Sequence, residues 1–165
     1  MIEVQENKYG KGVYAVTHIS TGTHIAPWCN YVSEEELLSI PKDKRNIDHV
    51  TKIASHRYTL KSEKVDDYFN HSCDPNSGLC FDGENVFLVA IRDIVPNEEV
   101  VWDYSTTIDK RAIEMFPEWK MVCGCGAANC RKIVDSFDTL PEKVRAQYAK
   151  LGILPEFLRD GSIVQ

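Results

Sequence analysis

The sequence predicts a mainly β fold of short strands, with short helices and one further helix near the C-terminus. Short runs of β-prone residues recur along the chain, and turn-forming residues such as glycine, proline and asparagine separate them. The chain contains no internal repeat and no low-complexity tract. Its 165 residues suffice for one domain with a sizeable core, so a second full domain is not expected.

The predicted strands are defined by β-prone runs and the turns beside them. Near the N-terminus, glycines precede the run 13–16, and the run 24–26 ends at a proline. A third strand is predicted at 57–60. The dipeptide Asp82-Gly83 is typical of a hairpin turn and precedes an apolar run at 86–91, which we expect to be a buried strand. A Pro-Asn-Glu turn then leads into the last predicted strand, at 99–104.

Two helices are predicted from capping patterns. Ser33 is placed to cap a helix, with Glu36 reaching back to it, before Pro41 stops the run. Near the C-terminus, Thr139 is expected to cap a second helix that ends at Gly152. The buried face of this second helix is expected to comprise Val144, Tyr148 and Leu151.

Charge and hydropathy limit the partners and the location that we expect. The net charge of -6 disfavours the phosphate backbone of a nucleic acid, so direct nucleic-acid binding is not expected. A basic polypeptide would be attracted, although modest acidity also serves solubility alone. The first residues lack the apolar core of a signal peptide, and no apolar run is long enough to span a membrane. We therefore expect an intracellular protein, cytoplasmic or nuclear, that is not secreted.

A cluster of cysteines near the C-terminus is typical of a metal site. Cys123, Cys125 and Cys130 lie within eight residues, and the neighbouring glycines leave the backbone free to wrap around an ion. A reducing compartment favours thiol ligands over disulfides. A structural zinc site needs four ligands, so a fourth must come from elsewhere in the chain. Unligated thiols or a redox pair are the alternative.

Two further motifs precede this cluster. The run 70–76 reads Asn-His-Ser-Cys-Asp-Pro-Asn, and the strand predicted at 99–104 ends in Trp-Asp-Tyr. In this order, the three motifs resemble those of SET-domain protein-lysine methyltransferases that carry a zinc-binding post-SET segment. The resemblance implies the SET fold, in which several small, short-stranded sheets are threaded by a C-terminal segment in a pseudoknot-like arrangement.

The resemblance also implies roles for individual residues. Tyr104 and Tyr58 correspond to the two active-site tyrosines, and Trp102 to the residue that sets how many methyl groups the lysine channel accepts. Cys73 becomes the fourth ligand of one structural zinc ion, beside the three clustered cysteines. The residues that the family uses to bind S-adenosylmethionine correspond here to Lys11, Gly12, Val13, Asn70, His71 and Tyr104.

These assignments imply a protein-lysine N-methyltransferase that uses S-adenosylmethionine on a protein or peptide lysine, with a histone tail as one candidate. They divide the chain into a SET domain at 1–110, a post-SET zinc segment at 111–134 and a C-terminal helical extension at 135–165. The alternative is a catalytically silent SET-like module that binds peptide or S-adenosylmethionine. A purely structural zinc protein would not explain why Asn70, His71 and Tyr104 accompany the thiols.

Overall fold

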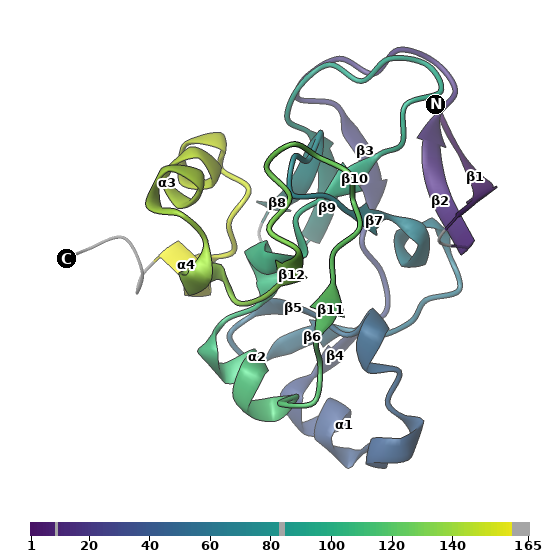
Figure 1. Ribbon diagram of the computed structural model, residues 1–165. Helices are drawn as coiled ribbons and strands as arrows, with labels where there is room; N and C mark the ends of the chain where they lie inside the picture. Colours follow the sequence, from purple (N-terminus) through teal and green to yellow (C-terminus); the bar gives the residue numbers. More distant parts are fainter. Residues whose placement is uncertain (9, 83–84, 160–165) are drawn as a thin grey trace.

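The computed structural model describes residues 1–8, 10–82 and 85–159, and among these the strands form five small sheets (Figure 1). The first sheet pairs β1 (Ile2–Asn7) with β2 (Gly10–Ala15). The second has the order β3 (His24–Pro27), β9 (Asn85–Ala90), β8 (Ser77–Asp82). The third has the order β4 (Tyr31–Ser33), β6 (Arg57–Thr59), β5 (Thr51–Ala54). The last two pair β7 (Asn70–His71) with β10 (Val101–Trp102), and β11 (Met121–Val122) with β12 (Ile133–Val134).

Helices in the described residues are short. The α-helices are α1 (Glu34–Ser39), α2 (Lys110–Met115), α3 (Glu142–Leu151) and α4 (Glu156–Arg159). The 3₁₀ helices are η1 (Lys42–Lys44), η2 (Ile47–His49), η3 (Val65–Tyr68), η4 (Tyr104–Thr107) and η5 (Phe137–Thr139). The predicted mainly β fold with small sheets is therefore confirmed.

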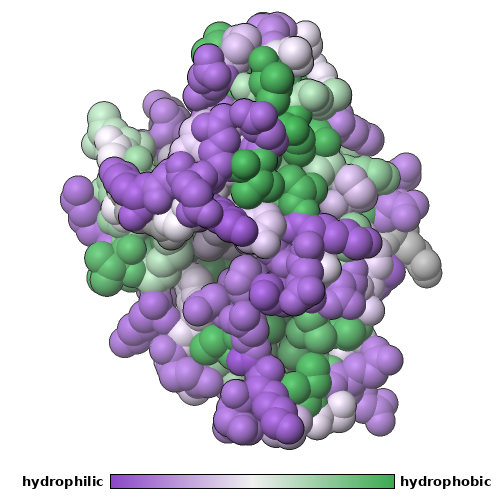
Figure 2. All heavy atoms as spheres, turned by 90° about the vertical axis from the view of Figure 1, so that its right-hand side faces the viewer, coloured by the Kyte–Doolittle hydropathy of each residue, from purple (hydrophilic) through white to green (hydrophobic). Residues whose placement is uncertain are grey.

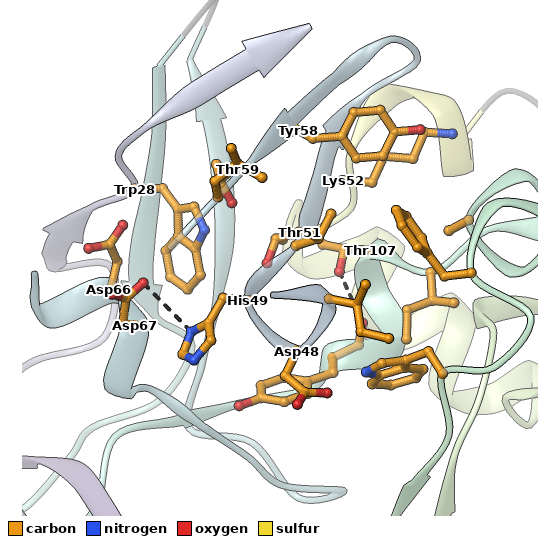
Figure 3. A pocket seen from close by; sticks show the side chains of 18 of the residues that line it. Trp28, Asp48, His49, Thr51, Lys52, Tyr58, Thr59, Asp66, Asp67 and Thr107 are labelled. Carbon is orange, nitrogen blue, oxygen red and sulfur yellow. Dashed lines mark hydrogen bonds and ion pairs between the residues drawn. The ribbon is translucent and has the colours of Figure 1, made fainter. Parts of the chain in front are cut away.

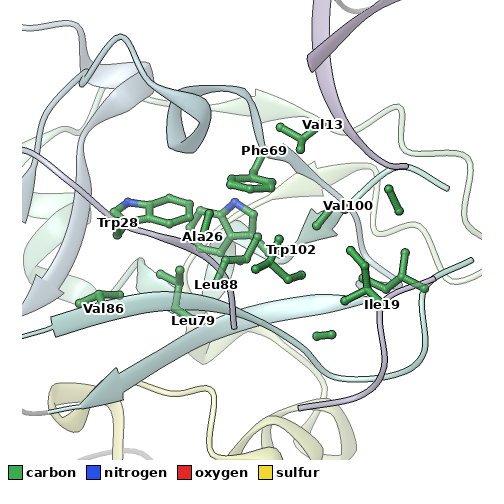
Figure 4. Close-up of a cluster of buried hydrophobic side chains, with 14 of the residues drawn as sticks. Val13, Ile19, Ala26, Trp28, Phe69, Leu79, Val86, Leu88, Val100 and Trp102 are labelled. Atoms are coloured by element: carbon green, nitrogen blue, oxygen red, sulfur yellow. The ribbon is translucent and has the colours of Figure 1, made fainter. Parts of the chain in front are cut away.

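The main hydrophobic core lies on one face of the β3–β9–β8 sheet. Side chains alternate along β9, so that Val86 and Leu88 point into this core (Figure 4). Trp28 and Trp102 meet there edge to face, with ring centroids 5.3 Å apart, and Phe69 stacks on Trp28. The core thus contains Phe69, which precedes the run 70–76, and Trp102, which pairs with His71 of that run.

Two segments that are far apart in the sequence run side by side in the middle of the molecule. Strand β7 pairs in parallel with β10, so that Asn70 lies opposite Val101 and His71 opposite Trp102. The side chain of Asn76 stabilises this pairing because its amide oxygen accepts from the Val101 backbone N–H at 2.9 Å. Its amide nitrogen donates to the Glu99 carbonyl at 2.7 Å. These bonds satisfy backbone groups of a segment whose strand is too short to pair them all.

The N-terminal helix forms as its sequence predicts. Ser33 accepts from the Glu36 backbone N–H, and the Glu36 carboxylate accepts from the Ser33 N–H, so the expected capping box is present.

The predicted strands at 24–26, 57–60 and 86–91 correspond to β3, β6 and β9. The predicted turn before 99–104 is also present, with Asn97 in the left-handed region at a φ of 66°. Gly83 of the predicted hairpin turn lies outside the described residues.

The C-terminal helix differs from its prediction at its first turn and on its buried face. Pro141, not Thr139, occupies the N-cap position, because Thr139 belongs to η5 and its hydroxyl donates to the Ser136 carbonyl. Leu151 is 40% exposed, so only Tyr148 of the expected face is fully buried. Gly152 ends the helix in the left-handed conformation, as expected.

The C-terminal extension, which we define as residues 137–158, covers the second face of the β3–β9–β8 sheet. Its buried side chains pack against Val89 and Ile91, which point away from the main core. Figure 1 shows α3 and α4 beside this sheet, on the side opposite the β1–β2 hairpin. The sheet is therefore enclosed on both faces, which explains why residues 137–158 are part of the folded unit.

One face of the surface is mostly polar. On the face shown in Figure 2, polar residues predominate, and hydrophobic residues gather in groups that polar residues interrupt. None of the helices in the described part of the chain has the length and apolar character needed to cross a membrane.

Candidate functional site

A pocket opens between the β4–β6–β5 sheet and the segment that follows β10. Its cavity volume is about 90 Å³. Figure 3 shows Trp28, Asp66 and Asp67 on one side of the pocket, with Tyr58 and Lys52 on the other. The aromatic residues that line it are Trp28, Tyr58, Phe69, Trp102, Tyr104, Phe116 and Trp119. Such a mixture of aromatic walls and a few polar groups suits a ligand that has an apolar stem and a polar end.

The carboxylates of the pocket differ in how they are bonded. Asp66 accepts from the Cys29 backbone N–H at 3.0 Å and from the Ser62 hydroxyl. Asp67 accepts from the Ser62 backbone N–H and lies 3.7 Å from a ring nitrogen of His49. Asp66 thus connects the loop before β7 to the segment after β3, whereas Asp67 bonds to the backbone of its own loop. Opposite them, Lys52 is buried and pairs with Asp109, with its ammonium over the ring of Phe157.

Tyr104 lies in the wall of this pocket at the start of η4. Its hydroxyl donates to the Phe69 carbonyl at 2.9 Å, and its ring is tilted against Trp102 with centroids 4.9 Å apart. Burial raises the pKa of Tyr104 well above its usual range, and the nearby carboxylates of Glu99 and Asp48 raise it further. The hydroxyl therefore stays protonated near neutral pH and donates its hydrogen to the backbone.

Trp102 forms the deeper part of the same wall. It is only 4% exposed, packed between Trp28 and Tyr104. Its indole N–H is buried and has no hydrogen-bond partner in the described part of the chain. Trp102 thus lines the pocket, and its role in setting the number of methyl groups stays a prediction.

Tyr58 also lines the pocket, but its hydroxyl is engaged elsewhere. It donates to Glu34 at 3.2 Å and lies 3.2 Å from the sulfur of Met115. Burial is the main cause of a strongly raised pKa for Tyr58, and Glu34 adds to it. Among the described residues, no hydrogen bond links Tyr58 with Tyr104. A catalytic role for Tyr58 stays a prediction.

A second polar cluster lies where β2 meets β7. The Asn70 amide donates to the Lys11 carbonyl at 2.9 Å and to the Glu99 carboxylate at 2.7 Å. The same carboxylate oxygen accepts from Asn7 at 3.0 Å. A Cβ at Gly12 would lie 2.3 Å from this oxygen, so glycine is needed here because side chains of the protein approach the backbone.

The other predicted residues of this cluster have different environments. The Lys11 side chain is exposed, and its ammonium lies 5.1 Å from the centre of the Tyr68 ring. Val13 is completely buried in the main core, and its carbonyl accepts from the Val100 N–H. Its side chain therefore serves packing. The structure brings Lys11, Gly12 and Asn70 together, and their binding of a cofactor stays a prediction.

His71 connects the pocket to the cysteine cluster. One ring nitrogen accepts from the Tyr104 backbone N–H at 3.2 Å, and the other lies 3.4 Å from the Cys73 sulfur. The ring is also 3.6 Å from Asp103. Burial lowers the pKa of His71 to about 4, so the ring is neutral near pH 7. One neutral ring therefore contacts both Tyr104 and Cys73.

Four cysteines meet at a single point. The sulfurs of Cys73, Cys123, Cys125 and Cys130 all lie within 4.8 Å of one another. The sulfur of Cys123 is 3.8 Å from that of Cys73 and 3.6 Å from that of Cys130. Tetrahedral Zn²⁺ with bonds of about 2.3 Å places its sulfur ligands roughly 3.8 Å apart. This cluster therefore fits one zinc ion, with Cys73 as the fourth member.

Sequence reasoning missed the residue that joins these parts. Asp103 is completely buried, and one carboxylate oxygen accepts from Arg131 at 2.7 Å and from the Ser105 N–H at 3.1 Å. The other oxygen accepts from the Tyr148 hydroxyl at 2.9 Å. The sequence signal was Tyr148 on the predicted buried face of the C-terminal helix, because a buried tyrosine hydroxyl needs a hydrogen-bond partner. The sequence does not say that this partner is Asp103.

Comparison with known proteins decides the family. The SET-domain family model matches residues 10–105, which is more than half of the chain. The chain belongs to the SET-domain family. In this SET domain, the match includes the run 70–76 and Tyr104, and it ends before the three clustered cysteines.

Curated relatives agree with the family. A histone H3 lysine-4 specific N-methyltransferase of Cryptococcus neoformans is 27% identical over 74% of this chain. Human histone-lysine N-methyltransferase 2B is 26% identical over 77% of this chain. The matches cover only 9% and 5% of those two proteins, so this SET domain corresponds to a small part of each.

A solved structure has the same fold. The crystal structure of KRYPTONITE, described as a complex with mCHG DNA and SAH, aligns with a TM-score of 0.63 at 22% identity. The alignment covers 81% of this chain and 29% of that chain. The fold of the SET domain is thereby confirmed.

Proposed function

We propose that this SET domain is a protein-lysine N-methyltransferase that uses S-adenosylmethionine on a lysine of a protein substrate, with a histone tail as one candidate. The observation that carries the proposal is the position of Tyr104. This residue lies in the wall of an aromatic pocket and contacts His71. His71 follows Asn70, which belongs to the polar cluster on the β2 side. A lysine site and a cofactor site would therefore meet near Tyr104.

The polar cluster around Gly12 suits the methionine part of S-adenosylmethionine. Its acceptors, the Glu99 carboxylate and the Lys11 carbonyl, suit an ammonium group. The Lys11 ammonium suits the carboxylate of this ligand, and the Tyr68 ring suits an aromatic base. We assign cofactor binding to Lys11, Gly12, Val13, Asn70, His71 and Tyr104, with Val13 acting through its backbone.

The aromatic walls of the pocket favour the neutral form of the lysine amine, whereas its carboxylates favour the charged form. A free lysine has a pKa of roughly 10.4, so only about one amine in a thousand is neutral near pH 7.4, a cost of about 4 kcal/mol. Burial among the aromatic side chains of Trp28, Phe69 and Trp102 lowers the pKa of the amine. Asp48, which is exposed at the pocket, attracts the protonated amine before it enters.

Tyr104 acts by position and not as a base. Because its hydroxyl hydrogen is donated to the Phe69 carbonyl, a lone pair of its oxygen is left to face a reacting group. When bound, S-adenosylmethionine supplies an electrophilic methyl group on a sulfonium. The Tyr104 oxygen accepts weak CH hydrogen bonds that align such a group with the amine. Trp102 limits the room around the amine, and Tyr58 lines the far wall of the pocket.

The cysteine cluster and the division of the chain complete the proposal. One structural zinc ion, bound by Cys73, Cys123, Cys125 and Cys130, holds the post-SET segment at 111–134 against the SET domain at 1–110. We assign residues 135–165 to a C-terminal helical region, of which 160–165 lie outside the described residues. We expect this protein to act inside the cell, without direct contact to nucleic acid.

The test is methyl transfer from labelled S-adenosylmethionine to histones and to a panel of lysine peptides. Tyr104→Phe removes one hydroxyl and should lower kcat by about 100-fold, a much larger change than the one it makes in cofactor affinity measured by calorimetry. The matched control is Tyr31→Phe. It removes a hydroxyl that accepts from the Val86 N–H outside the pocket, and it should retain activity.

The outcomes separate the two candidate functions. Incorporation of label that requires the Tyr104 hydroxyl supports the enzyme. Cofactor binding without transfer to any lysine would support a catalytically silent module. Absence of both in the wild-type protein would falsify the proposed function.

A further inference from the structure

The C-terminal extension is anchored by apolar packing. Phe137 and Leu154 are completely buried in its own hydrophobic cluster, together with Ile153. Ile153 lies so close to Gly78 of β8 that a Cβ at this glycine would come within 2.7 Å of it. These contacts hold the extension on the sheet mainly by apolar burial.

One polar group nevertheless lies on the buried face of α3. Tyr148 is 3% exposed, and its hydroxyl donates to Asp103 at 2.9 Å. The Asp103 carboxylate is completely buried, so a hydrogen bond to it forms away from solvent. A hydrogen bond to a buried charge is stronger than one between neutral groups, and its loss leaves the charge poorly satisfied.

Asp103 determines where η4 begins. Its carboxylate accepts from the Ser105 N–H and so caps η4, whose first residue is Tyr104. Arg131, from the segment after the clustered cysteines, binds the same oxygen as Ser105 does. The second oxygen is bound by Tyr148. The orientation of the carboxylate is therefore fixed from two sides, by Arg131 and by Tyr148 of the C-terminal extension.

We propose that Tyr148 is a positioning residue of the active site, acting through Asp103 to hold Tyr104 in place. This inference rests on the methyltransferase function proposed above. Without the Tyr148 hydroxyl, the second oxygen of Asp103 lacks its donor. The carboxylate then turns towards another donor, its bond to the Ser105 N–H weakens, and the start of η4 shifts. The C-terminal extension is thus part of the active-site support as well as a cover for the sheet.

The first test compares Tyr148→Phe with Tyr31→Phe, the hydroxyl deletion outside the pocket. We expect kcat to fall about ten-fold or more in Tyr148→Phe, because small displacements of a reacting geometry are costly. The KM for S-adenosylmethionine should stay within about two-fold of the wild-type value. The control should keep its kcat. A kcat for Tyr148→Phe within about two-fold of the wild-type value would overturn the proposal.

A second test does not depend on activity. In protein with labelled tyrosine rings, the nuclear magnetic resonance signal of Tyr104 is assigned from its absence in Tyr104→Phe. This signal should shift in Tyr148→Phe and stay in place in Tyr31→Phe. If the wild-type protein transfers no methyl group, the proposed function fails, but this signal still tests the contact. An unmoved Tyr104 signal in Tyr148→Phe would overturn the positioning role.

Discussion

The zinc tail, which we define as residues 121–134, and the C-terminal extension both reach Asp103, but they are held in opposite ways. The tail has two strands of two residues each, and its hydrophobic side chains at Val122 and Ile133 are 85% and 56% exposed. The extension buries six side chains in a cluster of its own. The tail buries only Val134 and Cys123, in a small cluster around the cysteines, whereas the extension has the larger apolar cluster.

This difference predicts what each region depends on. A segment that buries little apolar surface does not offset the entropy of ordering its backbone, so the tail needs the ligand bonds of a metal ion. The extension is ordered by apolar burial and does not need a metal. Removing zinc and shortening a buried side chain should therefore affect different regions, and experiments can separate them.

The largest expected effect is loss of zinc in Cys73→Ser. Binding of a structural zinc ion contributes on the order of 10–16 kcal/mol to folding. Because Cys73→Ser removes one thiolate ligand, we expect zinc to leave and the tail to lose its order. Elemental analysis should find one zinc per wild-type chain and none in the variant. Hydrogen exchange should rise at 121–134 and stay unchanged at 137–158. Full zinc content in Cys73→Ser would exclude Cys73 as a ligand, and Cys80→Ser, outside the cluster, is the matched control.

A smaller effect is expected from Leu154→Ala in the extension. Leu154 is completely buried, and truncation of such a side chain costs about 2–5 kcal/mol of the free energy of unfolding. Zinc content should not change. The control, Leu151→Ala, shortens a leucine that is 40% exposed and should cost much less. Equal losses in the two variants, measured by denaturant unfolding, would contradict the packing described for the extension.

The smallest effect concerns α2, which precedes the tail. Arg111 donates to Glu34 at 2.7 Å, and this bond is the main cause of a lowered pKa for Glu34. A lowered folded-state pKa stabilises the fold above the unfolded value of about 4.3, and this stabilisation is lost as the pH falls through the folded value. Because half of the Arg111 side chain is exposed, solvent screens the pair, and Arg111→Ala should lower stability only slightly near pH 7.

The measurement is thermal unfolding of wild type and Arg111→Ala across this pH range. The difference in stability should disappear once Glu34 is protonated, below its lowered pKa. A difference that is unchanged at acid pH would show that Arg111 stabilises α2 by packing. Neither result should alter the C-terminal extension, which contains no part of this ion pair.

Local patterns in the sequence were reliable where the physical cause is local. The capping box of Ser33 and Glu36 involves neighbours three residues apart, and the left-handed turn at Gly152 requires only a missing Cβ. Thr139 failed as a helix cap because it lies in η5, two residues before the N-cap position at Pro141. The grouping of Cys73 with the other three cysteines came from the family resemblance, and the structure brings the four together.

The sequence by itself determined the family, the mainly β class and the types of residue that chemistry requires, because motif order and local patterns are written along the chain. Only the tertiary structure decided which groups meet. The tertiary fold places Glu99 against Gly12, turns the Tyr58 hydroxyl towards Glu34, and brings Tyr148 to Asp103, 45 residues away in the chain. The physical reason is that a buried polar group takes whichever partner the packing brings within reach, and packing depends on the whole chain.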